Sequence, residues 1–337
     1  MLYQNIMKKN IFKKIFIKIS KALGYEIIDQ NEFYSPTLEK SLNEDLSIIN
    51  QKSIILPLGE VKITRKINSL LIIVRVNTKI DIWDQNKKRI FENLKIEYTS
   101  RSLNSLIKSI KFCYQKYPNI NIKTLLIDDN SDSENLSKIK KIIDLSNLDM
   151  KIINFNNQAY KNEIKQQKNP ETFANLSSLL KSFETGKKLG EDLVFFVEDD
   201  YIHFEPMLEE MIASYERISS QIESELFMCP TDYPYLYMNN EKTNILIGNK
   251  RHWRTVDKTL CTFMTNINFL EKYWDNFYNT CLDRNDPFER HINDIYKKEI
   301  CISPLKSLSV HMTNVNSNYG LSPFINYKKL WDENKES

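Results

Sequence analysis

The most constraining feature of this 337-residue chain is an apolar run that ends in three consecutive acids. Residues 193–197 read Leu-Val-Phe-Phe-Val, and Glu198, Asp199 and Asp200 follow directly. A continuous apolar run of this length predicts a strand buried on both faces of a sheet. Three carboxylates at its end repel one another unless a cation lies among them. Oxygen ligands of this kind suit Mg²⁺ or Mn²⁺, and an acidic, solvated turn is the alternative interpretation.

A second strand that ends in acids is predicted upstream. Residues 124–127 read Thr-Leu-Leu-Ile, and Asp128 and Asp129 follow them. Ligands of open α/β sheets bind at the carboxyl ends of the strands, so two acidic strand ends predict a shared site for a nucleotide and a metal ion. Residues 130–132 are good helix caps for a helix predicted over 133–145. Helix capping by residues 130–132 does not explain the adjacent acids Asp128 and Asp129.

The order of these segments resembles the GT-A glycosyltransferases, and the family 2 glycosyltransferases in particular. In that family a first strand leads to a nucleotide-binding loop, a later strand ends in a DDxSxD pattern, and a third ends in the DxD metal motif. The counterparts here are residues 70–77, 128–132 and 198–200, within a resemblance that covers about residues 69–311. It implies an α/β, GT-A-like (Rossmann-like) fold with a mostly parallel central sheet flanked by helices.

The resemblance implies a metal site. Asp200 matches the last DxD acid and is the expected ligand of Mn²⁺ or Mg²⁺. His311 matches a late histidine that closes the metal site in many GT-A enzymes, although a hydrogen-bonded core histidine is the alternative. Glu198 departs from the usual first DxD acid, and it and Asp199 are expected beside the ribose or a metal-bound water.

The resemblance also implies a nucleotide pocket. Asp129 matches the acid that contacts the nucleotide base, and Asp128 is expected to brace its loop. Arg75 and Asn77 stand where the family has a PxYN pattern, and both are expected near the nucleoside. An ion pair between Arg75 and one of the two aspartates is the structural alternative.

The second half of the chain offers further candidates for binding. Arg254 belongs to the basic, aromatic cluster 250–254, which is expected to attract the donor diphosphate, unless this cluster is a solvated hairpin tip. Tyr233, Tyr235 and Tyr237 alternate, as in a strand with one face toward an acceptor groove or toward a packed neighbour.

Asp286 and Glu289 are the candidate general bases. In inverting family 2 enzymes the base is an acid at the start of a helix beside the acceptor. Asp286 precedes Pro287, a residue favoured in the first helical turn, and a helix is predicted over 288–298. Asp286 could act only as a helix cap, and Glu289 competes for the catalytic role. The resemblance favours inversion at the anomeric carbon.

Composition argues against several other classes of protein. The 47 basic and 44 acidic residues nearly balance, so nothing indicates a nucleic-acid partner. Neither GxGxxG nor GxxxxGK[ST] occurs, which removes the dinucleotide fingerprint and the P-loop. The five cysteines are scattered and form no CxxC pair. This argues against structural zinc and a disulfide framework, and it favours a reducing cytoplasm.

The first 24 residues predict a basic amphipathic helix. Apolar residues recur there at helical spacing among lysines: Ile11, Phe12, Ile15, Phe16 and Ile19. Such a helix binds an anionic membrane surface and carries too many charges to span a bilayer. Packing on the body of the protein is the alternative. We therefore expect a cytoplasmic protein attached to the inner face of the cytoplasmic membrane.

These features predict three segments and one principal function. Residues 25–68 form a lead-in, and 69–337 form the glycosyltransferase domain, with a nucleotide half over 69–205 and an acceptor half over 206–337. The expected partners are a nucleotide-diphosphate sugar and a glycan or lipid-linked acceptor in surface polysaccharide synthesis. One alternative is a sugar nucleotidyltransferase, although 75–78 lacks its glycine-rich loop. The other is a non-catalytic glycan-binding module on the same fold.

Overall fold

The computed structural model describes residues 12, 15–20, 22–25, 48–50, 52–54, 60–79, 90–91, 93–167, 169–238, 242–312 and 318–335. The chain divides into two compact units, Met1–Glu44 with Ile54–Glu60 and Asp45–Ser53 with Val61–Ser337. The predicted domain boundaries at 24 and 69 stay predictions.

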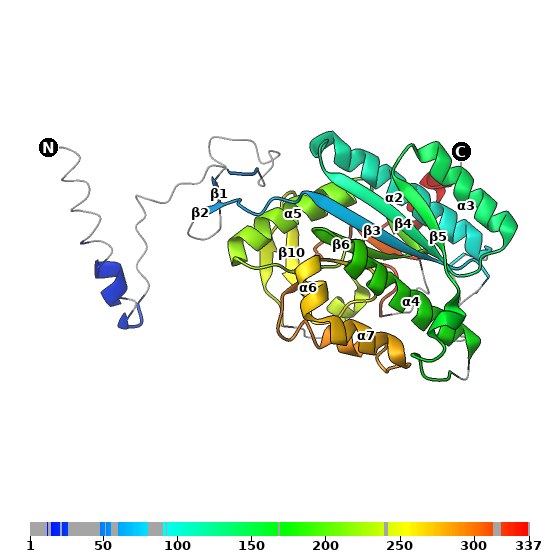
Figure 1. Cartoon of the computed structure of the whole chain (residues 1–337). Coiled ribbons are helices and arrows are strands. Elements are labelled where there is room, and N and C mark those ends of the chain that lie inside the picture. Colours follow the sequence, from blue (N-terminus) through cyan, green and yellow to red (C-terminus); the bar gives the residue numbers. More distant parts are fainter. Residues whose placement is uncertain are drawn as a thin grey trace. The chain divides into compact units, whose positions relative to one another are not determined.

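A nine-stranded sheet forms the centre of the larger unit (Figure 1). Its order is β5-β4-β3-β6-β11-β8-β12-β10-β9. The strands are β3 (Ser69–Val76), β4 (Asn121–Asp128), β5 (Met150–Asn154), β6 (Leu193–Glu198), β8 (Phe227–Met228), β9 (Ile245–Ile247), β10 (His252–Thr255), β11 (Phe263–Asn266) and β12 (Cys301–Pro304). Two further sheets have two strands each, β1 (Lys52–Ile54) with β2 (Glu60–Lys62), and β7 (Tyr201–His203) with β13 (Ser309–His311).

The strand pairings bring most carboxyl ends to one edge of the sheet. β3 is parallel to β4 and β6, and β4 is parallel to β5. β11 is antiparallel to both β6 and β8, so β8 and its parallel partner β12 run in the same direction as β6. In this sheet only β11 and β10 run against the others. The predicted α/β fold with a mostly parallel central sheet is confirmed.

Helices cover both faces of the sheet because the strand side chains alternate between the faces. Leu70, Ile72 and Val74 of β3 pack in one core cluster with α2 (Lys95–Lys116), α3 (Ser133–Ser146) and α5 (Met207–Ile222). Leu71 and Ile73 pack in a second cluster on the other face. Its helices are α4 (Pro170–Leu189), α6 (Ile267–Lys272) and α7 (Trp274–Leu282). Figure 1 shows α2 and α3 on one side of the strands and α4 and α7 on the other.

The helix starts near the predicted site differ from expectation. The sequence pattern predicts a helix over 102–117, but α2 begins at Lys95, because Ile96 and Tyr98 are buried and extend its packed face. The helix expected over 288–298 is reduced to α8 (Arg290–Asn293), with Glu289 at its N-cap. Tyr235 and Tyr237 lie in a 3₁₀ turn, η3 (Pro234–Tyr237), with Tyr233 at its N-cap, and not in a strand, because proline favours the start of a helical turn.

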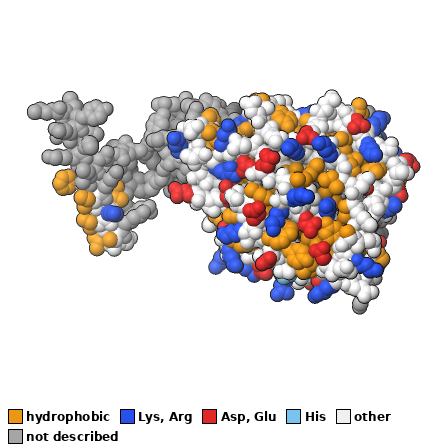
Figure 2. Space-filling view, viewed as in Figure 1, with side chains coloured by type: hydrophobic (Ala, Val, Ile, Leu, Met, Phe, Trp, Pro, Cys, Tyr) orange, Lys and Arg blue, Asp and Glu red, His pale blue; other side chains and the backbone are white. Residues whose placement is uncertain are grey.

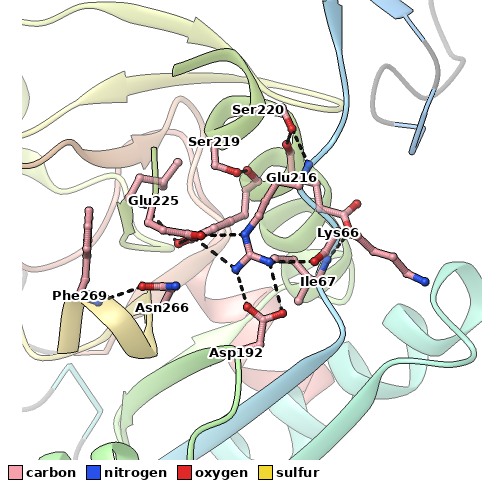
Figure 3. A network of polar contacts seen from close by, with 12 residues as sticks. Lys66, Ile67, Asp192, Glu216, Ser219, Ser220, Glu225, Asn266 and Phe269 are labelled. Atoms are coloured by element: carbon pink, nitrogen blue, oxygen red, sulfur yellow. Dashed lines mark hydrogen bonds and ion pairs between the residues drawn. The ribbon is translucent and has the colours of Figure 1, made fainter. Parts of the chain in front are cut away.

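The segment before β3 is fixed to the amino end of β6 and to α5 by a polar network (Figure 3). The Arg65 guanidinium contacts Asp192, and its Nε lies 2.9 Å from Oε1 of Glu225. The backbone N–H of Ile67 donates to Oε1 of Glu216 at 2.9 Å. Asp192 directly precedes β6, so this network lies at the edge of the sheet opposite the acidic strand ends.

The N-terminal unit contains a helical segment at residues 15–20. Its large apolar side chains are exposed, and in Figure 2 the described part of this segment is mainly hydrophobic: Phe12, Ile15, Phe16, Ile19 and Leu23. Ile11, predicted on the same stripe, lies outside the described residues. No helix in the described part of the chain is long and apolar enough to cross a membrane.

The C-terminal helix α9 (Tyr327–Glu333) packs on α2 and on the small β7–β13 sheet. Trp331 contacts Tyr98 edge to face at 4.6 Å between ring centroids, and the Arg101 guanidinium lies 4.2 Å from the Trp331 ring. α9 therefore anchors the chain that follows β13.

Candidate active site

The three acids at the carboxyl end of β6 each contact a different basic side chain. The pairs are Glu198 with Arg75, Asp199 with Lys95, and Asp200 with His311. The basic partners come from β3, α2 and β13, which are far apart in the sequence. The mutual repulsion predicted for the triplet is therefore relieved by three separate contacts.

Glu198 is paired through the strand register. Arg75 is its partner in the parallel β3–β6 pairing, and Nη2 of Arg75 lies 2.6 Å from Oε1 of Glu198. Arg75 also donates to Oδ1 of Asn175 at 2.7 Å. Burial raises the pKa of Glu198, although the charge of Arg75 opposes this shift. Arg75 thus forms an ion pair as one interpretation predicted, but with Glu198 rather than with Asp128 or Asp129.

Asp199 is held by the first turns of α2. Nζ of Lys95 lies 2.5 Å from Oδ1, and the Thr99 hydroxyl donates to Oδ2 at 2.7 Å. Lys95 and Thr99 lie four residues apart, so they share one face of the helix. Sequence reasoning missed both residues because it began the helix after them. Asp199 therefore ties the start of α2 to the end of β6.

Asp200 and His311 meet because β7 and β13 pair antiparallel, with His311 opposite Tyr201. The rings of Tyr201 and His311 stack, with their centroids 4.6 Å apart and an interplanar angle of 4°. Nδ1 of His311 lies 2.8 Å from the Tyr319 carbonyl oxygen. A carbonyl only accepts, so Nδ1 carries the hydrogen, and Nε2 faces Oδ2 of Asp200 at 3.4 Å. Burial lowers the pKa of His311, but Asp200, Glu198 and the Tyr319 carbonyl outweigh it, so this pKa lies above its ordinary value.

The Asp200–His311 pair fits a divalent cation. A hydrogen bond from the far nitrogen of the ring to a carbonyl is the arrangement that orients metal-ligating histidines in proteins. Within residues 12–335, as far as they are described, no group of three or more His, Cys, Asp or Glu side chains is placed to hold a metal ion. Two protein ligands suffice where substrate phosphates and water complete the coordination, as is usual for Mg²⁺.

Asp129 is the centre of a second polar cluster at the same edge of the sheet. Its side chain is 2% exposed, and it accepts hydrogen bonds from the amides of Asn130 and Asn157 at 3.1 Å and of Asn77 at 3.4 Å. Burial raises the pKa of Asp129 to about 6. The structure thus joins Asn77 and Asn157 to Asp129, and the nucleotide pocket stays a prediction. Asn157 could have been found from the sequence because it lies in a polar loop after β5, the strand next to β4.

Asp128 ends β4 and is buried beside this cluster. Burial raises the pKa of Asp128, and one of its carboxyl oxygens has no hydrogen-bond partner among the described residues. Asn130 follows with a φ of 58°, a left-handed conformation that asparagine tolerates. This turn directs the chain from β4 into α3.

The two candidate bases lie in different environments. Asp286 is exposed at a bend of the chain, whereas Glu289 is partly buried. Burial is the main cause of the raised pKa values of Tyr233 and Cys261, and the charges of both Glu289 and Glu198 add to these shifts. The charges of Glu289 and Glu198 thus act on the same two buried side chains.

Arg254 lies in a buried ion pair with Asp232, a residue that sequence reasoning did not single out. Asp232 follows β8, whose carboxyl end lies at the same edge of the sheet as that of β6. Asp232 also accepts a hydrogen bond from the Tyr237 hydroxyl at 2.5 Å. Arg254 thus already has a carboxylate partner, and its contact with a donor diphosphate stays a prediction.

Comparison with solved structures found partial matches at low sequence identity. The structure of residues 1–349 of S. aureus TarS aligns with 13% identity and a TM-score of 0.42, over 72% of this chain and 59% of that chain. GalNAc-T7 with UDP, GalNAc and Mn²⁺ aligns with 14% identity and a TM-score of 0.42, over 80% of this chain and 50% of that chain. UDP-glucose pyrophosphorylase complexed with UDP-glucose aligns with 7% identity and a TM-score of 0.36, over 73% of this chain and 93% of that chain.

Comparison with protein families and with curated proteins found no match. This chain spans 59% of the TarS chain and half of the GalNAc-T7 chain. Activity, substrates and partners are therefore inferred from the side chains of the site itself.

Proposed function

We propose that this protein is a metal-dependent glycosyltransferase that moves a sugar from a nucleotide-diphosphate sugar to a glycan or lipid-linked acceptor. The observation that carries the proposal is the Asp200–His311 pair at the end of β6, with its Nε2–Oδ2 distance of 3.4 Å. The Asp129 cluster lies at the same edge of the sheet, so one ligand with a nucleoside and a diphosphate could contact both.

The donor would be held by two groups of side chains. Asp129, with Asn77 and Asn157 around it, offers a carboxylate and amides that match the hydrogen-bonding groups of a nucleoside. Asp200 and His311 would hold Mn²⁺ or Mg²⁺, which neutralises the charge that grows on the diphosphate leaving group. Arg75 pairs with Glu198, so Asp200 rather than Glu198 would be the carboxylate ligand of the cation.

We assign the general base to Glu289. A base must reach the acceptor hydroxyl beside the donor, and Glu289 is partly buried whereas Asp286 is exposed to solvent. Glu289 would take the proton of the acceptor hydroxyl as its oxygen bonds to the anomeric carbon and the nucleoside diphosphate leaves from the opposite face, which gives an inverted product. Asp286 stays the alternative base.

The N-terminal segment would bind the inner surface of the cytoplasmic membrane. Its five exposed apolar side chains supply the buried area, and the lysines between them supply attraction to anionic lipid. Removal of residues 1–24 should release the protein from anionic liposomes in a sedimentation assay. Full-length protein that ignores such liposomes at low salt would show that this segment has another role.

The test is a product assay with UDP-, GDP- and dTDP-sugars, with and without Mn²⁺. Release of the nucleoside diphosphate only when Mn²⁺ is present is the expected result. Pyrophosphate release from a nucleoside triphosphate and a sugar phosphate would instead establish a nucleotidyltransferase. Failure of every sugar nucleotide to bind would favour the non-catalytic glycan-binding module.

A further inference from the structure

Tyr237 is the exposed end of a buried polar cluster formed with Asp232 and Arg254. The side chains of Asp232 and Arg254 are 2% and 8% exposed, and their ion pair is closed off from water. The Tyr237 hydroxyl donates to Oδ2 of Asp232 at 2.5 Å, and the Arg254 guanidinium lies 4.6 Å from the centre of the Tyr237 ring. These two contacts fix both the position and the tilt of the ring.

The ring of Tyr237 is presented to solvent although its hydroxyl is satisfied inside the protein. Tyr237 is 52% exposed, and the neighbouring Met238 is 66% exposed. A tyrosine usually keeps its polar tip in water and buries its apolar body. The reverse arrangement here leaves an apolar aromatic surface at the outside of a rigid support.

This surface belongs to the edge of the sheet that carries the site. The backbone N–H of Ser309 in β13 donates to the Pro230 carbonyl at 3.0 Å, which joins the strand of His311 to the segment that leads into the turn of Tyr237. The hydroxyls of Tyr233 and Tyr201 lie 2.7 Å apart, and Tyr201 stacks on His311. The turn that carries Tyr237 is therefore bonded to the residues that orient the metal ligand.

The charges of the cluster indicate which ligand would suit it. Asp232 and Arg254 neutralise each other, so the support of the ring attracts neither an anion nor a cation. An aromatic face without net charge favours the apolar C–H face of a neutral sugar ring. We infer that Tyr237 is a platform for an uncharged sugar residue of the acceptor, with Asp232 and Arg254 as its positioning residues. This inference rests on the proposed glycosyl transfer and names the acceptor class.

The experiment is an array of neutral and anionic oligosaccharides probed with the full-length protein. Wild type should bind neutral members, and Tyr237→Ala should weaken that binding about 10-fold, since an aromatic contact contributes about 1.4 kcal/mol at most. Tyr237→Phe, which keeps the ring but loses its hydrogen bond, should fall in between. Tyr278→Ala is the matched control, because the Tyr278 hydroxyl also donates to a carboxylate, that of Glu163 at 3.1 Å.

Donor hydrolysis separates this inference from the proposed function. Tyr237→Ala should retain the Mn²⁺-dependent release of nucleoside diphosphate from the sugar nucleotide that wild type uses. The inference is wrong if wild type binds only the anionic oligosaccharides of the array. It is also wrong if Tyr237→Ala binds the neutral oligosaccharides as well as wild type does. Absence of donor hydrolysis in wild type contradicts the proposed function but leaves the array result interpretable.

Discussion

The two ends of β6 carry similar residues in different arrangements. At the amino end one arginine, Arg65, contacts two carboxylates, Asp192 and Glu225. At the carboxyl end three acids each have their own partner, and the partner of Asp200 is a histidine. An arginine stays charged and closes a network permanently. A histidine can exchange a proton for a metal ion, so the carboxyl end can change its state and the amino end cannot.

The comparison predicts that a single substitution at the carboxyl end removes function and leaves the fold. Asp200→Ala should lower glycosyl transfer by on the order of 10³-fold, because the leaving diphosphate would lose its neutralising cation. Thermal unfolding should change little, because the Asp200 side chain is 30% exposed. Unchanged turnover at saturating Mn²⁺ would contradict the metal site.

Substitutions at the two candidate bases, Asp286 and Glu289, test which of them acts in catalysis. Glu289→Gln should lower kcat by at least about 10²-fold, because the amide cannot take up the acceptor's proton. Asp286→Asn should keep near-normal turnover, since Asp286 is exposed at a bend. Donor affinity should be unchanged in both variants. The opposite pattern, with Asp286→Asn inactive and Glu289→Gln active, would return the role to Asp286.

Asp129 predicts a dependence of donor binding on pH. Burial raises the pKa of Asp129 to about 6, and the carboxylate form is the one that accepts hydrogen bonds from a nucleoside. Nucleotide affinity should therefore be about 10-fold weaker at about pH 5 than at about pH 7. The folded pKa exceeds the unfolded one, so the stability that this group contributes at acid pH is lost as pH rises toward 6. Calorimetric titration at several pH values measures the affinity, and Asp129→Asn should flatten its profile.

A substitution at the amino end of β6 should lower stability and leave activity unchanged, which is the reverse of the effect expected for Asp200→Ala. Arg65→Ala removes the bridge between Asp192 and Glu225 and should lower the free energy of unfolding by about 1–3 kcal/mol. The activity of the molecules that remain folded should be normal. Arg65→Lys should recover only part of the stability. Lysine keeps the positive charge, but it cannot contact both carboxylates in the same planar geometry. A loss of nucleotide binding in either variant would show that the two ends are coupled.

The features that sequence predicted are those with a local cause. The apolar run before Glu198 forms β6, and α3 begins at Ser133 as predicted, with Asp132 at its N-cap position. His311 was placed beside Asp200 by its order in the family pattern, and the register of β13 against β7 explains their contact. These positions follow from periodicity, strand ends and capping, which are visible in a short window of sequence.

The features that sequence missed depend on pairings between distant segments. Lys95 contacts Asp199 only because α2 begins earlier than its apolar pattern indicated. Asp232 contacts Arg254 because β8 and β10 flank β12 in the sheet, an order that no local pattern encodes. The alternating tyrosines looked like a strand, but Pro234 begins a 3₁₀ turn there, which left Tyr237 alone at the surface.

The central claim is that Asp200 and His311 together hold the cation of the sugar nucleotide. Electron paramagnetic resonance of Mn²⁺, with each sugar nucleotide added in turn, measures this directly. We predict that wild type binds Mn²⁺ tightly only when the nucleotide that it uses is present, and that Asp200→Ala and His311→Ala each lose this binding. Equal Mn²⁺ binding by wild type and both variants in the presence of that nucleotide would contradict the account.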